Sequence, residues 1–117
     1  MMNLYTCLID LKNEAKALNF AMALEAWMTH LQDKGVIAGW QLYRRKLNLA
    51  SSMHRDFLLE IAVEDLTQLD QAFRTLASHD DEVERLYHTV HEQIQAADFG
   101  LYRPFPDPER AERMALV

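Results

Sequence analysis

Apolar and polar positions follow two different periods along this chain, and the order of those periods predicts an α+β fold. Residues 3–12 carry apolar side chains at neighbouring positions, which predicts a central strand covered on both faces. Residues 36–47 and 54–63 predict two further strands, and the short polar link between them makes the pair a hairpin. Residues 99–105 predict a short fourth strand, which ends where prolines interrupt the pattern.

Helical periods fill the intervals between these strands. Asn13 is a suitable N-cap for a helix that continues to about residue 34, and Gly35 follows as a suitable residue after its end. Asp65 caps a second helical segment, which residues 78–81 interrupt before a third begins. The first helix carries its apolar face at +4, +3 and +4 spacing on Phe20, Leu24, Trp27 and Leu31. The third helix carries its apolar face on Val83, Leu86, Val90 and Ile94.

The order of elements is βαββαβ, with the second helical region split in two, and this is the order of the ferredoxin-like fold. Right-handed crossovers then give an antiparallel sheet in the order 4-1-3-2 with the helices on one face. Residues 1–105 form the predicted domain, and residues 106–117 form a C-terminal tail. The tail ends in apolar residues that are available to dock on another surface.

The hairpin assigns its side chains to two faces, because successive residues of a strand point to opposite sides. One face is mostly apolar and is expected to meet the helices. It carries Trp40, Leu42, Arg44, Phe57, Leu59 and Ile61. The other face is mixed and carries Gln41, Tyr43, Arg45, Asp56, Leu58 and Glu60. Apolar area of this size on an uncovered sheet predicts a symmetric homodimer in which two sheets pack face to face.

On this order of elements, residues 3–105 resemble the dimeric α+β barrel superfamily, and they look closest to its small uncharacterised and stress-responsive members. The resemblance implies a ferredoxin-like subunit that pairs with a second copy to close a barrel. Relatives with this fold include cofactor-free monooxygenases, haem-degrading enzymes, lactone isomerases and proteins of no known activity. No set of residues here matches the catalytic motif of any of them, so the resemblance leaves the activity open.

Composition narrows the classes of partner. The chain has 117 residues, half of them hydrophobic, and a net charge of −6 with a pI near 5.2. Because nucleic-acid binders usually carry a basic stripe, we expect no nucleic-acid partner. No apolar run is long enough to span a bilayer and the N-terminus is unlike a signal peptide, so we expect no membrane partner. Cys7 is the single cysteine, so no internal disulfide can form, and a reducing cytoplasm is the expected compartment. Its place in a central strand predicts that the Cys7 side chain is buried and packs as a small hydrophobic group.

Four residues of the mixed face are candidates for ligand binding: Tyr43, Arg45, Asp56 and Glu60. Arg45 is expected to lie opposite Asp56, where its guanidinium suits a carboxylate or enolate ligand. Asp56 or Glu60 would then act as a general base with Tyr43 as a donor. The alternative is that these charges are cross-strand or interface ion pairs with a structural role, which are the commoner case.

Other polar residues carry weaker hypotheses. Glu84, His88, His91 and Gln95 are spaced to form one stripe of a helix, which predicts either a divalent-metal site or, in the favoured interpretation, a solvated helix face. Asp10 lines the barrel mouth or forms the turn into the first helix, and the turn is favoured. No glycine-rich phosphate loop is present, and no cofactor is expected.

These observations predict a small cytoplasmic homodimer that binds a small organic molecule in its barrel, with or without cofactor-independent catalysis. An anionic molecule suits Arg45. The alternative function is a non-enzymatic interaction or regulatory module whose barrel is filled by side chains. Metal binding at His88 and His91 is a third hypothesis.

Overall fold

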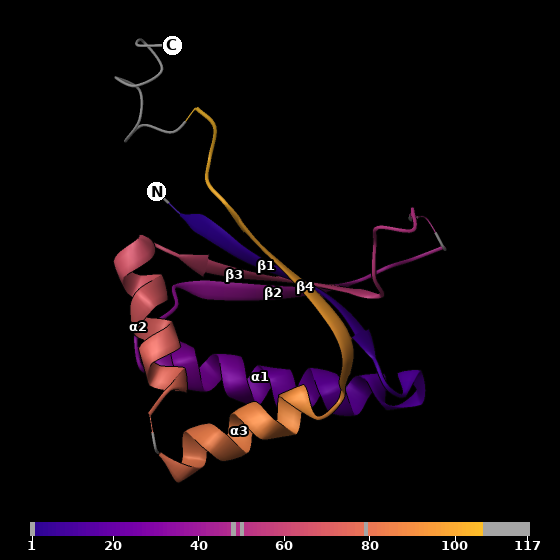
Figure 1. The fold of residues 1–117 in the computed structure, drawn as a ribbon, viewed down its shortest axis with the longest axis horizontal. Coiled ribbons are helices and arrows are strands. Elements are labelled where there is room, and N and C mark those ends of the chain that lie inside the picture. Colours follow the sequence, from indigo (N-terminus) through magenta and orange to yellow (C-terminus); the bar gives the residue numbers. More distant parts are fainter. Residues whose placement is uncertain (1, 48, 50, 79, 107–117) are drawn as a thin grey trace.

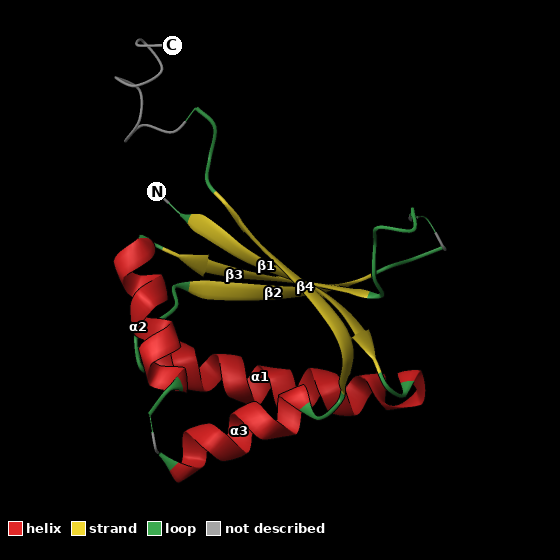
Figure 2. Ribbon diagram, in the orientation of Figure 1, coloured by secondary structure: helices red, strands yellow, loops and turns green. Residues whose placement is uncertain are grey.

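A computed structural model describes residues 2–47, 49, 51–78 and 80–106. It contains one four-stranded antiparallel sheet with three α-helices on one side of it (Figure 1, Figure 2). The strands are β1 (Asn3–Leu11), β2 (Gly39–Arg44), β3 (Phe57–Val63) and β4 (Ile94–Tyr102). Their order in the sheet is β2-β3-β1-β4, so the predicted ferredoxin-like topology is confirmed.

The helical segments are the 3-10 turn η1 (Glu14–Lys16), α1 (Ala17–Asp33), α2 (Leu66–Leu76) and α3 (Asp81–His91). The first two helical regions begin at the caps that the sequence predicts, and the first ends before Gly35 as predicted. The side chain of Asn13 accepts the backbone N–H of Ala15 over 3.0 Å. The side chain of Asp65 accepts the N–H of Gln68 over 2.8 Å. Gly35 follows α1 with φ of 74°, a conformation that glycine adopts without a steric penalty.

The bounds of the later elements differ from the prediction. Helix α3 ends at His91, and Ile94 begins β4 rather than closing the apolar face of the helix. The last strand starts at Ile94 instead of residue 99 because this segment pairs with β1, with Ile94 opposite Leu11. Strands β2 and β3 are also shorter than predicted, and a longer loop joins them. The predicted tail lies outside the described residues except for its first residue, Pro106.

The core lies between the sheet and the helices. Strand β1 contributes Cys7, Ile9 and Leu11, and β3 contributes every second residue from Phe57 to Val63. In the hairpin, Trp40 lies opposite Ile61 and Tyr43 lies opposite Leu58, which confirms the predicted assignment of the two faces. Helix α1 buries five residues against this layer, namely Phe20, Leu24, Trp27, Met28 and Leu31.

Helix α2 is packed differently from α1 and α3, because none of its residues is buried. Its apolar residues Leu69, Ala72 and Leu76 are partly buried against the core, and Phe73 is half exposed. The helix therefore covers one end of the sheet without filling the space beneath it.

The opposite face of the sheet has no helix over it in the described part of the chain (Figure 1). Leu8 and Leu58 lie opposite one another on this face, and Tyr43 extends the apolar area across β2. We call this surface the helix-free face. Within the described residues, no helix combines the length and the hydropathy needed to cross a membrane.

Candidate functional site

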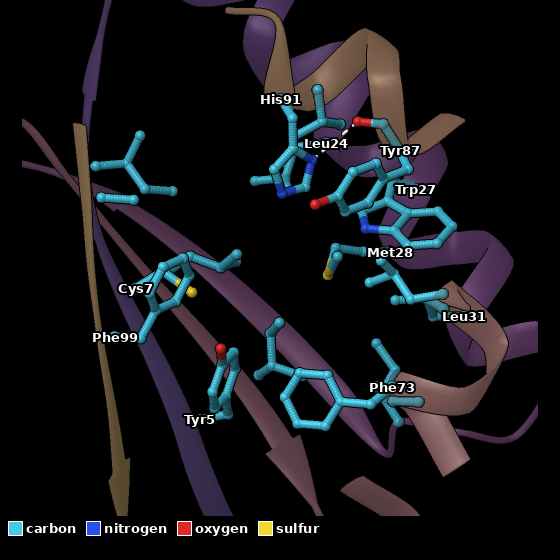
Figure 3. A pocket seen from close by; sticks show the side chains of 18 of the residues that line it. Tyr5, Cys7, Leu24, Trp27, Met28, Leu31, Phe73, Tyr87, His91 and Phe99 are labelled. Carbon is cyan, nitrogen blue, oxygen red and sulfur yellow. Dashed lines mark hydrogen bonds between the residues drawn. The ribbon is translucent and has the colours of Figure 1, made fainter. Parts of the chain in front are cut away.

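A cavity of about 360 Å³ lies between the helix-facing side of the sheet and the three helices (Figure 3). We call it the sheet–helix cavity. Strands β1, β3 and β4 form its floor, and α1, α2 and α3 form its walls. Among the residues that the structure describes, no Asp, Glu, Lys or Arg lines it. Its volume is within the range typical of small-molecule sites, and its lining is almost entirely apolar and aromatic.

Two polar groups of the cavity come from β1. Burial raises the pKa of Tyr5, and the nearby Cys7 and Tyr87 add to that shift. Burial also raises the pKa of the Cys7 thiol to about 12, so the thiol stays protonated and is a poor nucleophile at neutral pH. The buried position agrees with the role predicted for this cysteine. These groups therefore offer uncharged hydrogen-bond partners to anything in the cavity.

A histidine and a tyrosine from α3 form the third polar feature. The rings of His91 and Tyr87 stack with their centroids 3.7 Å apart. The Nδ1 of His91 lies 2.9 Å from the backbone oxygen of Tyr87. Burial lowers the pKa of His91, and the hydrogen bond to Tyr87 opposes that shift only in part. At neutral pH the imidazole is therefore uncharged.

Aromatic side chains surround the opening of the cavity. Phe73, His91 and Phe99 are the lining residues with the most exposure, so they mark the route from solvent. The ring of Tyr5 stacks on Phe99, with centroids 5.9 Å apart, and meets Phe73 edge to face at 5.8 Å. In Figure 3 the hydroxyl of Tyr5 points towards Cys7, away from the end of the ring that carries the backbone. An entering molecule would therefore contact aromatic side chains first.

The four residues predicted to bind a ligand lie elsewhere, on the helix-free face. Glu60 pairs with Gln41, and Tyr43 pairs with Leu58, so the predicted register is confirmed. The guanidinium Nη2 of Arg45 donates to Asp56 Oδ1 over 2.9 Å. None of these four residues lines the sheet–helix cavity. Their role in ligand binding stays a prediction, and the Arg45 charge is already paired with a carboxylate.

Arg55, which sequence reasoning did not single out, forms two further ion pairs next to this one. Its Nη1 donates to Asp10 over 2.8 Å, and its Nε donates to Asp98 over 2.9 Å. Asp10 remains in β1, where its second oxygen also accepts the backbone N–H of Asp56. The turn favoured for Asp10 from the sequence is therefore wrong, because these bonds hold the residue in the strand.

The proposed metal stripe is divided between two elements. Glu84, His88 and His91 lie on α3, whereas Gln95 lies on β4. His88 pairs with Glu92 over 3.2 Å, and His91 turns to Tyr87 and the cavity instead of to solvent alone. Within the described residues, no three His, Cys, Asp or Glu side chains are grouped as a metal site requires. The side chains of the stripe are thus not brought together as ligands.

Sequence reasoning also missed the residues that shape the cavity. Tyr5, Tyr87 and Phe99 come from three different elements, β1, α3 and β4, and in the sequence each is an ordinary core position. One signal was available for His91, because it stands one residue after Val90 on the apolar side of a helix. A histidine beside an apolar stripe is a candidate for a cavity edge as well as for a solvated face.

The order of the strands and the placement of the helices define this chain as a ferredoxin-like α+β protein. The chain belongs to a family described as a family of unknown function (DUF6614), whose sequence model matches residues 2–117. No curated protein matches the sequence.

Solved structures with the same fold share little sequence with this chain. A DABB family protein from Mesorhizobium loti aligns with a TM-score of 0.64 and 14% identity, over 89% of this chain and 97% of that one. A dimeric ferredoxin-like protein of unknown function from Jannaschia sp. aligns with a TM-score of 0.63 and 9% identity, over 89% and 100%. SnoaB, described as a cofactor-independent oxygenase from Streptomyces nogalater, aligns with a TM-score of 0.65 and 7% identity, over 91% and 98%. At these identities the likeness shows the fold alone.

Proposed function

We propose that this protein binds a small, uncharged and largely apolar organic molecule in the sheet–helix cavity. The observation that carries this proposal is a space of about 360 Å³ with an opening to solvent and no ionic side chain in its lining. Natural interiors are close-packed, and an unfilled apolar space of this size lowers stability unless something occupies it. A ligand of roughly ten to fifteen heavy atoms is expected to bind with micromolar to millimolar Kd.

The cavity changes the chemistry expected of the ligand. An anionic molecule suits Arg45 on the helix-free face, but the sheet–helix cavity offers no cation to pair with it. A buried charge without a partner is expensive, so an uncharged molecule fits this site better. SnoaB, which shares the fold, is described as a cofactor-independent oxygenase. The proposal therefore covers binding with or without cofactor-independent catalysis.

A fluorescence titration with N-phenyl-1-naphthylamine, an uncharged dye that brightens in apolar surroundings, tests the proposal. Ala72 lines the cavity from α2, and Ala72→Phe is expected to fill it and to weaken binding at least about tenfold. Ala26→Phe is the matched control, since Ala26 is an exposed residue of α1 outside the cavity. No saturable binding, or equal binding by both variants, would overturn the proposal and favour the interaction module.

We also propose that the functional unit is a homodimer that buries the helix-free face. Leu4, Leu8, Leu58 and Tyr43 give this face an apolar centre, and water would otherwise cover it. Proteins of the same fold from Jannaschia sp., Bacteroides fragilis and Thermobifida fusca are described as dimeric. The residues Tyr43, Arg45, Asp56 and Glu60 would then lie at the interface or in the enclosed barrel.

Sedimentation equilibrium tests the dimer. The wild-type chain is expected to sediment as a dimer at micromolar concentration, and Leu58→Glu is expected to sediment as a folded monomer, because a carboxylate would be buried between the sheets. Leu18→Glu on α1 is the control, since Leu18 is 80% exposed and lies on the opposite side of the subunit. A wild-type monomer would contradict the proposal.

A further inference from the structure

The hydrogen bond between His91 and Tyr87 determines which ring nitrogen of the histidine carries the proton. A carbonyl oxygen only accepts, so Nδ1, which lies 2.9 Å from the backbone oxygen of Tyr87, must be the protonated nitrogen. In the uncharged ring Nε2 is then an acceptor with a free lone pair. His91 is an exposed residue, so this lone pair is accessible to a donor.

The Nε2 atom of His91 points into the cavity. His91 lines the cavity, and in Figure 3 the ring nitrogen without a dashed line points into the open space between α3 and the sheet. The stacked ring of Tyr87 and the Nδ1 bond hold the imidazole in this orientation from two sides. The cavity therefore contains a fixed hydrogen-bond acceptor next to its opening.

Across the open space from this acceptor, the cavity wall carries flat rings (Figure 3). Tyr5 and Phe99 are nearly parallel, with an angle of 20° between their planes, and Phe73 stands perpendicular to Tyr5 at 89°. Aromatic rings prefer such stacked and edge-to-face neighbours. A planar ligand in this space would contact aromatic faces and edges, whereas a bulky aliphatic one would lose these contacts.

We propose that the ligand is an uncharged aromatic or otherwise planar ring that carries a hydroxyl group and donates its O–H to Nε2 of His91. This inference rests on the proposed binding function and specifies its ligand class. The hydroxyl of a phenol or enol satisfies the free acceptor, and the ring occupies the apolar space. A hydrocarbon would leave Nε2 without a partner once water is displaced, which costs free energy. A carboxylate would meet a lone pair instead of a donor.

Three ligands of similar shape separate these cases: 1-naphthol, 1-methylnaphthalene and 1-naphthoate. Isothermal titration of the wild-type protein at about pH 8, where His91 is uncharged, is expected to give 1-naphthol an affinity about tenfold above 1-methylnaphthalene. The affinity of 1-naphthoate is expected to be the lowest of the three, because its charge has no partner in the cavity.

Two substitutions test whether the imidazole of His91 causes the preference for 1-naphthol over 1-methylnaphthalene. His91→Phe keeps a stacked ring and removes the acceptor, so it is expected to abolish the preference for 1-naphthol while 1-methylnaphthalene still binds. Tyr87→Phe is the matched control, because it removes the hydroxyl but keeps the backbone oxygen that holds Nδ1. It is expected to retain the preference.

Equal affinity of 1-naphthol and 1-methylnaphthalene for the wild-type protein would overturn the ligand class and leave the binding function in place. Failure of every compound to bind, the uncharged dye included, would overturn both. If His91→Phe does not fold, His91→Leu replaces it, since an alkyl side chain also lacks the acceptor. Retention of the 1-naphthol preference in a folded variant of either kind would also overturn the ligand class.

Discussion

Arg55 reaches Asp10 across the end of the sheet, with its Nη1 2.8 Å from the carboxylate Oδ2. The two residues are 45 positions apart in the chain. The same carboxylate accepts the backbone N–H of Asp56 over 3.0 Å. One side chain of β1 therefore holds the start of β3 in place through one charged and one backbone donor.

Replacing Asp10 by Asn is expected to lower the free energy of unfolding by about 1 kcal/mol, because a charge-assisted bond to Arg55 becomes a neutral one. Urea denaturation measures the change. Asp70→Asn is the control, since Asp70 pairs with Arg74 on an exposed turn of α2 and such pairs contribute about 0.5 kcal/mol or less. Equal losses in the two variants would show that Asp10 has no special role.

The loss of folding stability at low pH provides a second test of the role of Asp10. Burial acts to raise the pKa of Asp10, but the Asp56 N–H and the Arg55 guanidinium outweigh it and hold that pKa below its usual value of 3.8. Because the folded pKa is lowered, the stability from this carboxylate is present above about pH 3.8 and is lost as pH falls through the folded pKa. The wild-type and Asp10→Asn proteins should therefore converge in stability in acid. A constant difference would contradict this origin.

His91 predicts a separate effect of pH near neutrality. Burial lowers the pKa of His91 below 6.5, so the unfolded chain takes up a proton at a higher pH than the folded protein does. The folding stability that the neutral His91 ring contributes is present above about pH 6.5 and is lost as pH falls through the pKa of the folded protein. Tyr5 and Cys7, which also face the cavity, have raised pKa values and do not titrate in this range.

The measurement is a thermal unfolding series between about pH 5 and pH 8. His91→Phe should flatten the part of the profile that His91 causes. An unchanged profile in this variant would assign the effect to other histidines.

The backbone conformation of Gly35 predicts that a larger residue at this position lowers the stability of the fold. Its φ is 74°, and a Cβ there would meet no atom within 4 Å. Gly35→Ala is therefore expected to lower stability by about 1 kcal/mol through backbone strain and not through a clash. Gly39→Ala is the matched control, because that site is equally open and has no positive φ. It should stay within about 0.5 kcal/mol of the wild type in urea denaturation.

The packing of α2 predicts uneven protection of the helices against hydrogen exchange. Helix α1 buries five residues, whereas α2 buries none and covers the opening of the cavity with Phe73. Segments with few buried contacts open at lower free energy. Amides of Leu66–Leu76 are thus expected to exchange faster than those of Ala17–Asp33, and a ligand in the cavity should slow them. Equal protection of both helices would contradict this picture.

Local pattern was sufficient for most of the fold. Period-2 alternation placed Trp40 and Leu42 on the helix side and Tyr43 on the other, and the pairing in the sheet confirms it. Asn13 and Gly35 marked the ends of the first helical region because their chemistry acts on neighbouring backbone groups. The start of β4 was missed, because Ile94 fits a helical period and only its pairing with Leu11 makes it a strand residue.

The location of the candidate site was less predictable from the sequence than the fold was. Alternation along each strand established which side chains share a face, and this predicted the Arg45–Asp56 pair. The packing of the helices placed the cavity on the helix side, where Tyr5, His91 and Phe99 line it. A cavity depends on how closely whole helices approach a sheet, and α2 approaches without burying a residue. Side-chain periods specify a direction for each residue, but they do not specify the distance between the layers.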